Sequence, residues 1–165
     1  MVELQSRTNP LTEIEIENFF KIHFPYRLKI LSAVAEYPRK VSEDPFWPSI
    51  YESAQITCRM FIQFFGLTAD YNTPHLLKSK TTYFSSHQGT STEVKIIDFG
   101  RDFIEAHSLS PEKHSFLRHA YDAGSKSTAH LNWDEKEFAE PSKVIKAACE
   151  IRKIMFDKFP ELNCS

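Results

Sequence analysis

The sequence predicts an all-α, single-domain bundle of about five helices with one long loop rich in Ser and Thr. Three observations favour this fold class. Only four glycines occur in 165 residues, which is few for the turns of a β-sandwich or barrel. Hydrophobic residues recur at helical spacing in several segments. Fourteen phenylalanines supply large apolar side chains, and the chain is long enough to bury them in one core.

The first helix is expected to begin at Thr12, because Glu15 three residues later completes a capping box. The alternation of residues 13–17 is also typical of a strand, but the cap and the later Phe spacing favour a helix. Its apolar face would consist of Ile16, Phe19, Phe20, His23 and Phe24. Pro25 suits the first turn of a second helix that ends near Glu36. The apolar side of this second helix would consist of Tyr26, Ile30, Ala33, Val34 and Tyr37.

The most strongly patterned segment covers residues 46–65, after a polar connection at 38–46. We predict a central helix there, ended by Gly66. One broad arc of this helix is apolar and is expected to lie in the core: Trp47, Ile50, Ala54, Thr57, Cys58, Phe61, Phe64 and Phe65. The opposite side is polar and is expected to lie outside the core: Glu52, Gln55, Arg59 and Gln63.

Residues 67–92 show no clear periodicity. A connection of that length is unusual in a compact domain, so we interpret it as a mobile segment, a functional loop or a loop that holds a short element. The next stretch, 93–107, has two interpretations. Its start, Val94 to Ile97, is compatible with a strand, whereas a helical face would contain Ile96, Phe99, Phe103, Ile104 and His107.

Two further helices are expected in the C-terminal part. Ser110 and Pro111 mark the start of a helix that runs to about Leu131. Its buried stripe would contain Leu117, Ala120, Tyr121, Gly124, Thr128 and Leu131. Because glycine destabilises a helix, we expect Gly124 to mark a close approach by another helix. The last helix begins near Pro141 and buries Val144, Ala148, Ile151, Met155 and Phe159. We expect the ends, 1–10 and 160–165, to be flexible.

Composition excludes several classes of protein. A net charge of −2 argues against a nucleic-acid or membrane binder that uses its whole surface. The N-terminus lacks the basic start and apolar run of a secretory signal, and no apolar stretch is long enough to span a bilayer. The three cysteines, Cys58, Cys149 and Cys164, form no CxxC pair. Two of them fall in expected helices, which indicates buried free thiols and a cytoplasmic location.

Three motif fragments do not support a function. Asp98-Phe99-Gly100 matches the magnesium-binding triplet of kinases, but the chain is too short for a kinase and lacks the other kinase motifs. The segment from Gly124 to Thr128 resembles part of a phosphate loop, yet it lacks the first glycine and lies in an expected helix. The seven histidines include no HxxxH pair, so the sequence predicts no metal and no cofactor.

Basic residues give two candidate ligand-binding sites. Helical rotation places His119, Lys126 and His130 within roughly 40° on the polar side of the 110–131 helix. Such a cluster is compatible with an anion or phosphate site, but a polar helix side needs no further cause, so a solvated helix face or His130 capping the helix end is the favoured interpretation. Arg59 is the only cation on the polar side of the central helix. If another element covers that side, Arg59 needs a carboxylate or phosphate partner; otherwise solvent satisfies it.

A third group is Arg101, Asp102 and His107, an Arg followed by a polar residue with a His six positions after the Arg. This arrangement resembles the signature of the HEPN domains, small helical bundles of prokaryotic toxins and antiviral systems. The resemblance implies metal-independent RNA cleavage, usually in a homodimer that pools two copies of the motif. It implies that Arg101 stabilises the phosphorane, that His107 moves the proton of the 2′-hydroxyl and that Asp102 arranges them.

In one continuous helix, residues six apart diverge by roughly 120°, so this motif requires a break or bend between Arg101 and His107. The sequence therefore leaves three functional hypotheses. The first is a non-catalytic helical protein that binds a partner or a small ligand. The second is a HEPN-like ribonuclease, with RNA as substrate and a homodimer as the active form. The third is an anion-binding module. A protein or RNA partner fits these hypotheses, whereas a membrane does not.

Overall fold

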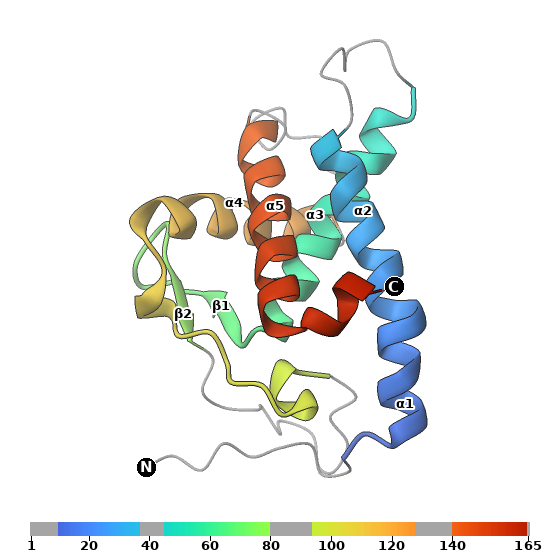
Figure 1. The fold of residues 1–165 in the computed structure, drawn as a ribbon. Coiled ribbons are helices and arrows are strands. Elements are labelled where there is room, and N and C mark those ends of the chain that lie inside the picture. Colours follow the sequence, from blue (N-terminus) through green and yellow to red (C-terminus); the bar gives the residue numbers. More distant parts are fainter. Residues whose placement is uncertain (1–9, 37–44, 80–93, 128–139, 165) are drawn as a thin grey trace.

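The computed structural model describes residues 10–36, 45–79, 94–127 and 140–164. These residues form a helical bundle with one small β-hairpin packed at its side (Figure 1). The helices are α1 (Glu13–Asn18), α2 (Phe24–Glu36), α3 (Trp47–Phe64), α4 (Pro111–Ser127) and α5 (Pro141–Lys158). The strands are β1 (Leu67–Ala69) and β2 (Leu77–Ser79), and they pair antiparallel. No helix in these ranges is both long and apolar enough to cross a membrane.

The two helices predicted at the N-terminus are one continuous helix, so the described residues form four helices rather than the five expected. Thr12 and Glu15 form the predicted capping box. Between α1 and α2 the chain makes one wide π turn, Phe19–His23, in which the Phe24 N–H donates to the Phe19 carbonyl. Pro25 has no N–H to donate and directly follows this turn. Proline removes one helical hydrogen bond and its ring crowds the preceding turn, and the wide turn gives the helix room to continue past it.

The apolar side predicted for residues 25–36 is wrong in part. Tyr26 and Ala33 are exposed, whereas Phe24, Leu28, Leu31 and Val34 are buried. The segment carries two overlapping apolar stripes. Because the helix continues through Pro25, the stripe aligned with Phe24 faces the core, and the stripe through Tyr26 does not.

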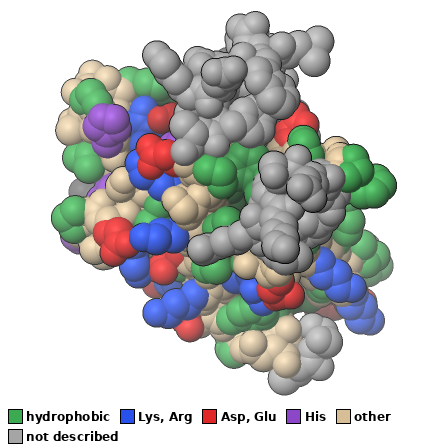
Figure 2. Space-filling view, turned by 90° about the horizontal axis from the view of Figure 1, so that it is seen from above, with side chains coloured by type: hydrophobic (Ala, Val, Ile, Leu, Met, Phe, Trp, Pro, Cys, Tyr) green, Lys and Arg blue, Asp and Glu red, His purple; other side chains and the backbone are tan. Residues whose placement is uncertain are grey.

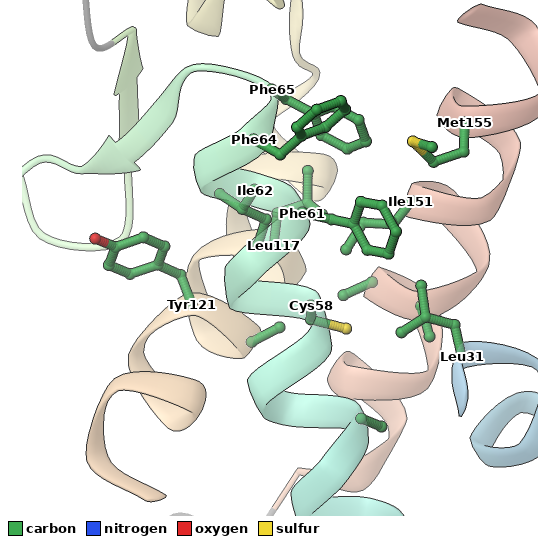
Figure 3. Packing of buried hydrophobic residues seen from close by; sticks show 14 of the residues in the cluster. Leu31, Cys58, Phe61, Ile62, Phe64, Phe65, Leu117, Tyr121, Ile151 and Met155 are labelled. Carbon is green, nitrogen blue, oxygen red and sulfur yellow. The ribbon is translucent and has the colours of Figure 1, made fainter. Parts of the chain in front are cut away.

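The predicted apolar arc of α3 is confirmed. Its residues are buried except Ile50, which is half-buried, and Phe61 lies among Leu31, Cys58 and Ile151 between α3 and α5 (Figure 3). The expectation for the polar side is correct for Glu52, which is exposed, and wrong for the other three residues, because α4 packs against that side. Gln55 is buried and Arg59 is half-buried, with its guanidinium over the Tyr121 ring. Covering this side with a second apolar helix face buries more hydrophobic surface than leaving it to solvent.

The hairpin lies within the segment predicted as a long loop, so that segment does contain a short element; residues 80–92 lie outside the described residues. Its tip is held by Arg118, which donates to the Asp70 and Leu76 carbonyls at 2.9 and 2.7 Å. His114 accepts from the Leu77 N–H at 3.2 Å. Its other ring nitrogen lies 3.0 Å from the Ala106 carbonyl. The ring is therefore neutral and donates to Ala106.

Residues 94–110 are neither the strand nor the helix considered above. Two 3-10 turns, Ile96–Phe99 and Ala106–Ser108, flank an extended stretch that begins after Gly100, whose backbone is left-handed. Of the apolar residues of this segment, Ile96 is fully buried, while Phe99, Phe103 and Ile104 pack partly on the core. His107 is exposed. A residue with positive φ interrupts helical hydrogen bonding, which explains why the apolar spacing fails to continue as a helix.

The last two helices begin as predicted, with Ser110 accepting from the Lys113 N–H and α5 starting at Pro141. All five predicted core residues of α5 are fully buried. Thr128 and Leu131 lie outside the described residues. The predicted burial of both helical thiols is correct for Cys58 and wrong for Cys149, which is exposed on α5. After α5, Pro160–Cys164 forms a 3-10 helix in which Leu162 is buried.

Candidate functional site

A cleft of about 320 Å³ opens between the helix of residues 13–36, the C-terminal half of α3 and the start of the 94–110 segment. Its apolar lining consists of Phe19, Phe24, Met60, Phe61, Phe64 and Val94. Its polar lining consists of His23, Arg27, Gln63 and Lys95. Apolar walls with a few polar groups that converge on one side are typical of small-molecule sites.

The π turn positions the part of the cleft wall that Phe19 and His23 form. It brings Phe19 and His23 to the cleft, with their ring centroids 4.9 Å apart. Phe19 also contacts Phe24 at 5.5 Å, and Phe24 contacts Phe64 of α3 at 5.6 Å. These contacts join the wall to the aromatic core, so its shape is set by packing. Wide turns in helices occur frequently at functional sites, which supports a binding role for this cleft.

Arg27 sits on the polar side of the cleft, one turn beyond the π turn. Its Nε donates to the Met60 sulfur at 3.0 Å, and one terminal nitrogen donates to the His23 carbonyl at 3.2 Å. That nitrogen also lies 3.4 Å from His23 Nδ1. Among the described residues, no carboxylate lies within ion-pair distance of Arg27. A guanidinium has five N–H donors in a planar fork, so this side chain retains donors for an anionic group.

Lys95 completes the basic side of the cleft. The residue is only 6% exposed, and its ammonium donates to the Gln63 carbonyl at 3.3 Å. Its backbone N–H donates to Asp98 Oδ2 at 2.7 Å, which fixes the start of the 3-10 turn that carries it. A lysine buried at the edge of an apolar cavity is strongly disposed to attract negative charge, because water screens it poorly there.

The described residues that line the cleft include Arg27, Lys95 and His23 but no acidic residue. This is a local departure from the rest of the molecule, whose net charge is −2. On the face shown in Figure 2, basic and acidic side chains are interspersed. The cleft therefore combines an aromatic wall with concentrated positive charge, a pairing suited to a ligand that has an apolar body and an anionic group.

The structure does not bring the Arg101, Asp102 and His107 side chains together as one site. Arg101 caps the C-terminal end of α5: its Nε donates to the Lys158 carbonyl at 3.0 Å, and its guanidinium lies over the Phe159 ring. His107 lies at the hairpin side, with Nδ1 4.0 Å from a carboxylate oxygen of Glu105. Among the described residues, Arg101 and His107 share no hydrogen bond or ion pair. Asp102 is exposed.

The candidate anion site on α4 is described only in part. His119 is half-buried, the Lys126 backbone belongs to α4, and His130 lies outside the described residues. Arg59 packs between α3 and α4, where it donates to the Gly124 carbonyl at 3.5 Å. Arg59 is therefore part of the contact between two helices and does not line the cleft.

The sequence prediction missed the cleft. The pattern places His23 on an apolar helix face and gives no reason to single out Arg27 or Lys95. One signal was present: Pro25 inside a helical pattern predicts a local irregularity, and His23 and Arg27 flank it. The contribution of Lys95 and α3 depends on tertiary packing, which the pattern does not specify.

Comparison of the chain with models of protein families, with curated proteins and with solved structures finds no match. Within the described residues, no group of three or more His, Cys, Asp or Glu side chains is arranged to hold a metal ion.

Proposed function

We propose that the protein is a non-catalytic binding protein whose cleft takes a small amphipathic anion: an apolar, preferably aromatic body with a carboxylate, sulfate or phosphate group. The observation that carries this proposal is the cleft itself, in which Arg27 and Lys95 stand beside a Phe wall with no acidic residue in the described lining. The cleft volume of about 320 Å³ suits a small ligand rather than a polymer.

Each part of the cleft has a distinct task in this proposal. The apolar body contacts Phe19 and Phe64, and the driving force is removal of apolar surface from water. The anionic group meets the Arg27 fork, with Lys95 adding charge from the opposite element. The polar lining consists of His23, Arg27, Gln63 and Lys95, and we assign these groups to recognition of the anionic end of the ligand. The free, buried thiol of Cys58 supports a cytoplasmic location.

The test is a calorimetric titration of the protein with three probes. The probes are 2-naphthoate, its neutral analogue 2-naphthalenemethanol, and inorganic phosphate. We expect 2-naphthoate to bind best, because it satisfies both the wall and the basic side. The neutral analogue is expected to bind about tenfold more weakly, which corresponds to the loss of one charge-assisted hydrogen bond. Phosphate alone should bind weakest, since it buries no apolar surface.

Arg27→Gln is the decisive variant and Lys29→Gln its matched control, because Lys29 is exposed on the same helix and does not line the cleft. We expect Arg27→Gln to weaken 2-naphthoate binding by about tenfold and to leave binding of the neutral analogue unchanged. The control should bind like the wild type. Equal affinity of all three proteins for 2-naphthoate, or equal affinity of the wild type for the charged and neutral probes, would rule out the proposed site.

A further inference from the structure

The guanidinium of Arg27 is held in a different way from those of three other arginines. Each of those three has a carboxylate within ion-pair distance: Arg101, Arg118 and Arg152. Arg27 is held by two neutral acceptors instead, the Met60 sulfur at 3.0 Å and the His23 carbonyl at 3.2 Å. A neutral acceptor fixes the direction of a guanidinium without cancelling its charge. Arg27 therefore combines a set geometry with a positive charge that attracts an anion.

Met60 reaches Arg27 from the other helix that lines the cleft. It lies on α3 beside Phe61 and one turn before Phe64, whose side chains are buried (Figure 3). The Met60 side chain is half-buried, packs against that core and also lines the cleft. Its sulfur is therefore an acceptor at a fixed place. An arginine without such an anchor would sample many rotamers and would lose that freedom when it binds an anion.

The two contacts also decide which donors of Arg27 remain for a ligand. A guanidinium can meet an anion with its side, formed by Nε and one terminal nitrogen, or with its end, formed by both terminal nitrogens. The Met60 sulfur takes the Nε–H, and one terminal nitrogen donates to the His23 carbonyl. The other terminal nitrogen makes no hydrogen bond or ion pair with any residue that the structure describes. An anion therefore meets the end of the guanidinium rather than its Nε side.

We propose that Met60 is a positioning residue of the cleft, whose sulfur holds the Arg27 guanidinium with its end ready for the anionic group of the ligand. This role deepens the binding function and rests on it. Met60 lowers the ordering cost that Arg27 has to meet when the ligand binds. It therefore sets how strongly the cleft prefers an anion over a neutral molecule of the same shape. The thioether is a weak, uncharged acceptor, so it does this without competing for the charge of Arg27.

The first test needs no ligand. Heteronuclear NMR on the full chain measures how fast the Arg27 Nε–H exchanges with water, and the signal is assigned by its loss in Arg27→Gln. Met60→Leu keeps the apolar volume and removes the acceptor, so we expect exchange to become severalfold faster. Met60→Gln should restore slow exchange, because its amide oxygen can accept from Nε. Equal exchange rates in the wild type and Met60→Leu would overturn the proposed role.

The second test is the charge preference of the cleft, defined as the ratio of its affinities for 2-naphthoate and 2-naphthalenemethanol. We expect Met60→Leu to lower this ratio by about threefold, through weaker binding of 2-naphthoate alone, and Met60→Gln to restore it. Met155→Leu is the matched control, since it makes the same exchange in the buried core and Met155 does not line the cleft. In an Arg27→Gln background, Met60→Leu should leave the ratio unchanged, because no guanidinium is there to be held.

The outcomes separate the role of Met60 from the binding function. A Met60→Leu variant that keeps the full ratio, or that weakens both probes equally, overturns the positioning role and leaves the binding function standing. The same holds if Met60→Leu lowers the ratio in the Arg27→Gln background, because its effect would then not pass through Arg27. A wild type with no charge preference overturns the binding function itself, and the role of Met60 with it.

Discussion

Gly124 of α4 lies so close to α3 that a Cβ atom at its position would come within 2.4 Å of the Gln55 carbonyl oxygen. The same Cβ would lie 2.8 Å from the Cβ of Arg59. Neither obstacle is the mobile end of a side chain, so the two helices must separate to admit a methyl group. The close approach predicted from a glycine in the buried stripe is therefore confirmed. It explains how α4 covers the polar side of α3.

Gly124→Ala is expected to destabilise the protein by about 2 kcal/mol, because overpacking of the helix contact outweighs the gain in helix propensity of up to about 1 kcal/mol. Urea unfolding followed by circular dichroism measures the change. Gly100→Ala is the comparison, since Gly100 has φ +69° and open space around it. It should lose about 1 kcal/mol from backbone strain alone. A more stable Gly124→Ala would show that the helices can separate freely.

Arg118→Met is expected to cost about 2–4 kcal/mol and to release the hairpin tip. Arg118 is 9% exposed, forms an ion pair with Asp122 at 2.8 Å and donates to two hairpin carbonyls. The methionine side chain has no N–H group, so both carbonyls would lose this donor. Hydrogen exchange at residues 70–77 should accelerate more than exchange in α5. Lys146→Met, which removes an exposed ion pair with Glu112, should change stability by less than about 1 kcal/mol. Unchanged exchange at 70–77 would contradict the assigned tether.

The free energy of unfolding is expected to fall above pH 10, because the phenol of Tyr51 ionises more readily in the unfolded chain than in the folded protein. Burial is the main reason that the pKa of Tyr51 is raised to about 12. The folded state therefore favours the neutral phenol: its contribution is intact below pH 10, the ordinary pKa, and is lost as the pH rises towards 12. The loss amounts to about 2 kcal/mol over that range. Tyr51→Phe should remove this part of the pH dependence, measured by urea unfolding at pH 9, 10 and 11. Parallel curves for the two proteins would contradict it.

The two described free thiols should differ sharply in reactivity. Burial raises the pKa of the Cys58 thiol, and this residue is fully enclosed between α3 and its neighbours, whereas Cys149 is exposed. In a Cys164→Ser background, 5,5′-dithiobis(2-nitrobenzoate) should titrate one thiol rapidly in the native state and the second only in denaturant. Cys149→Ser should abolish the rapid reaction. Rapid reaction of both thiols would mean that the core opens easily.

The ribonuclease hypothesis can be tested separately from the binding function. Given the capping role of Arg101, we expect Arg101→Ala to lower stability by about 1–2 kcal/mol and His107→Ala to leave stability unchanged. Degradation of single-stranded RNA in chelator should be absent from the wild type and from both variants. RNA cleavage by the wild type that His107→Ala abolishes would favour the Arg101/His107 mechanism, acting across a dimer.

Local patterns predicted the parts of the fold that depend on local chemistry. The cap at Thr12, the arc of α3 and the core face of α5 follow from residue types at helical spacing. The stripe of α2 did not, because Tyr26 and Leu28 are both apolar and only the continuity through Pro25 selects between them. The sequence pattern does not predict the cleft for a similar reason. Its polar residues Arg27, Gln63 and Lys95 come from three segments that only tertiary packing brings together.

The wide turn at residues 19–23 also constrains how this chain can change in length. Excising one residue there would restore a regular α ladder, but the ring of Pro25 would then oppose a carbonyl four positions earlier without the extra space. Because the wide turn already accommodates the additional residue, its excision would leave the two parts of the helix in nearly the same rotational phase, and the clash at Pro25 would be its main cost. Loss of a single residue, which loops tolerate, should therefore be excluded from this turn unless Pro25 is replaced at the same time.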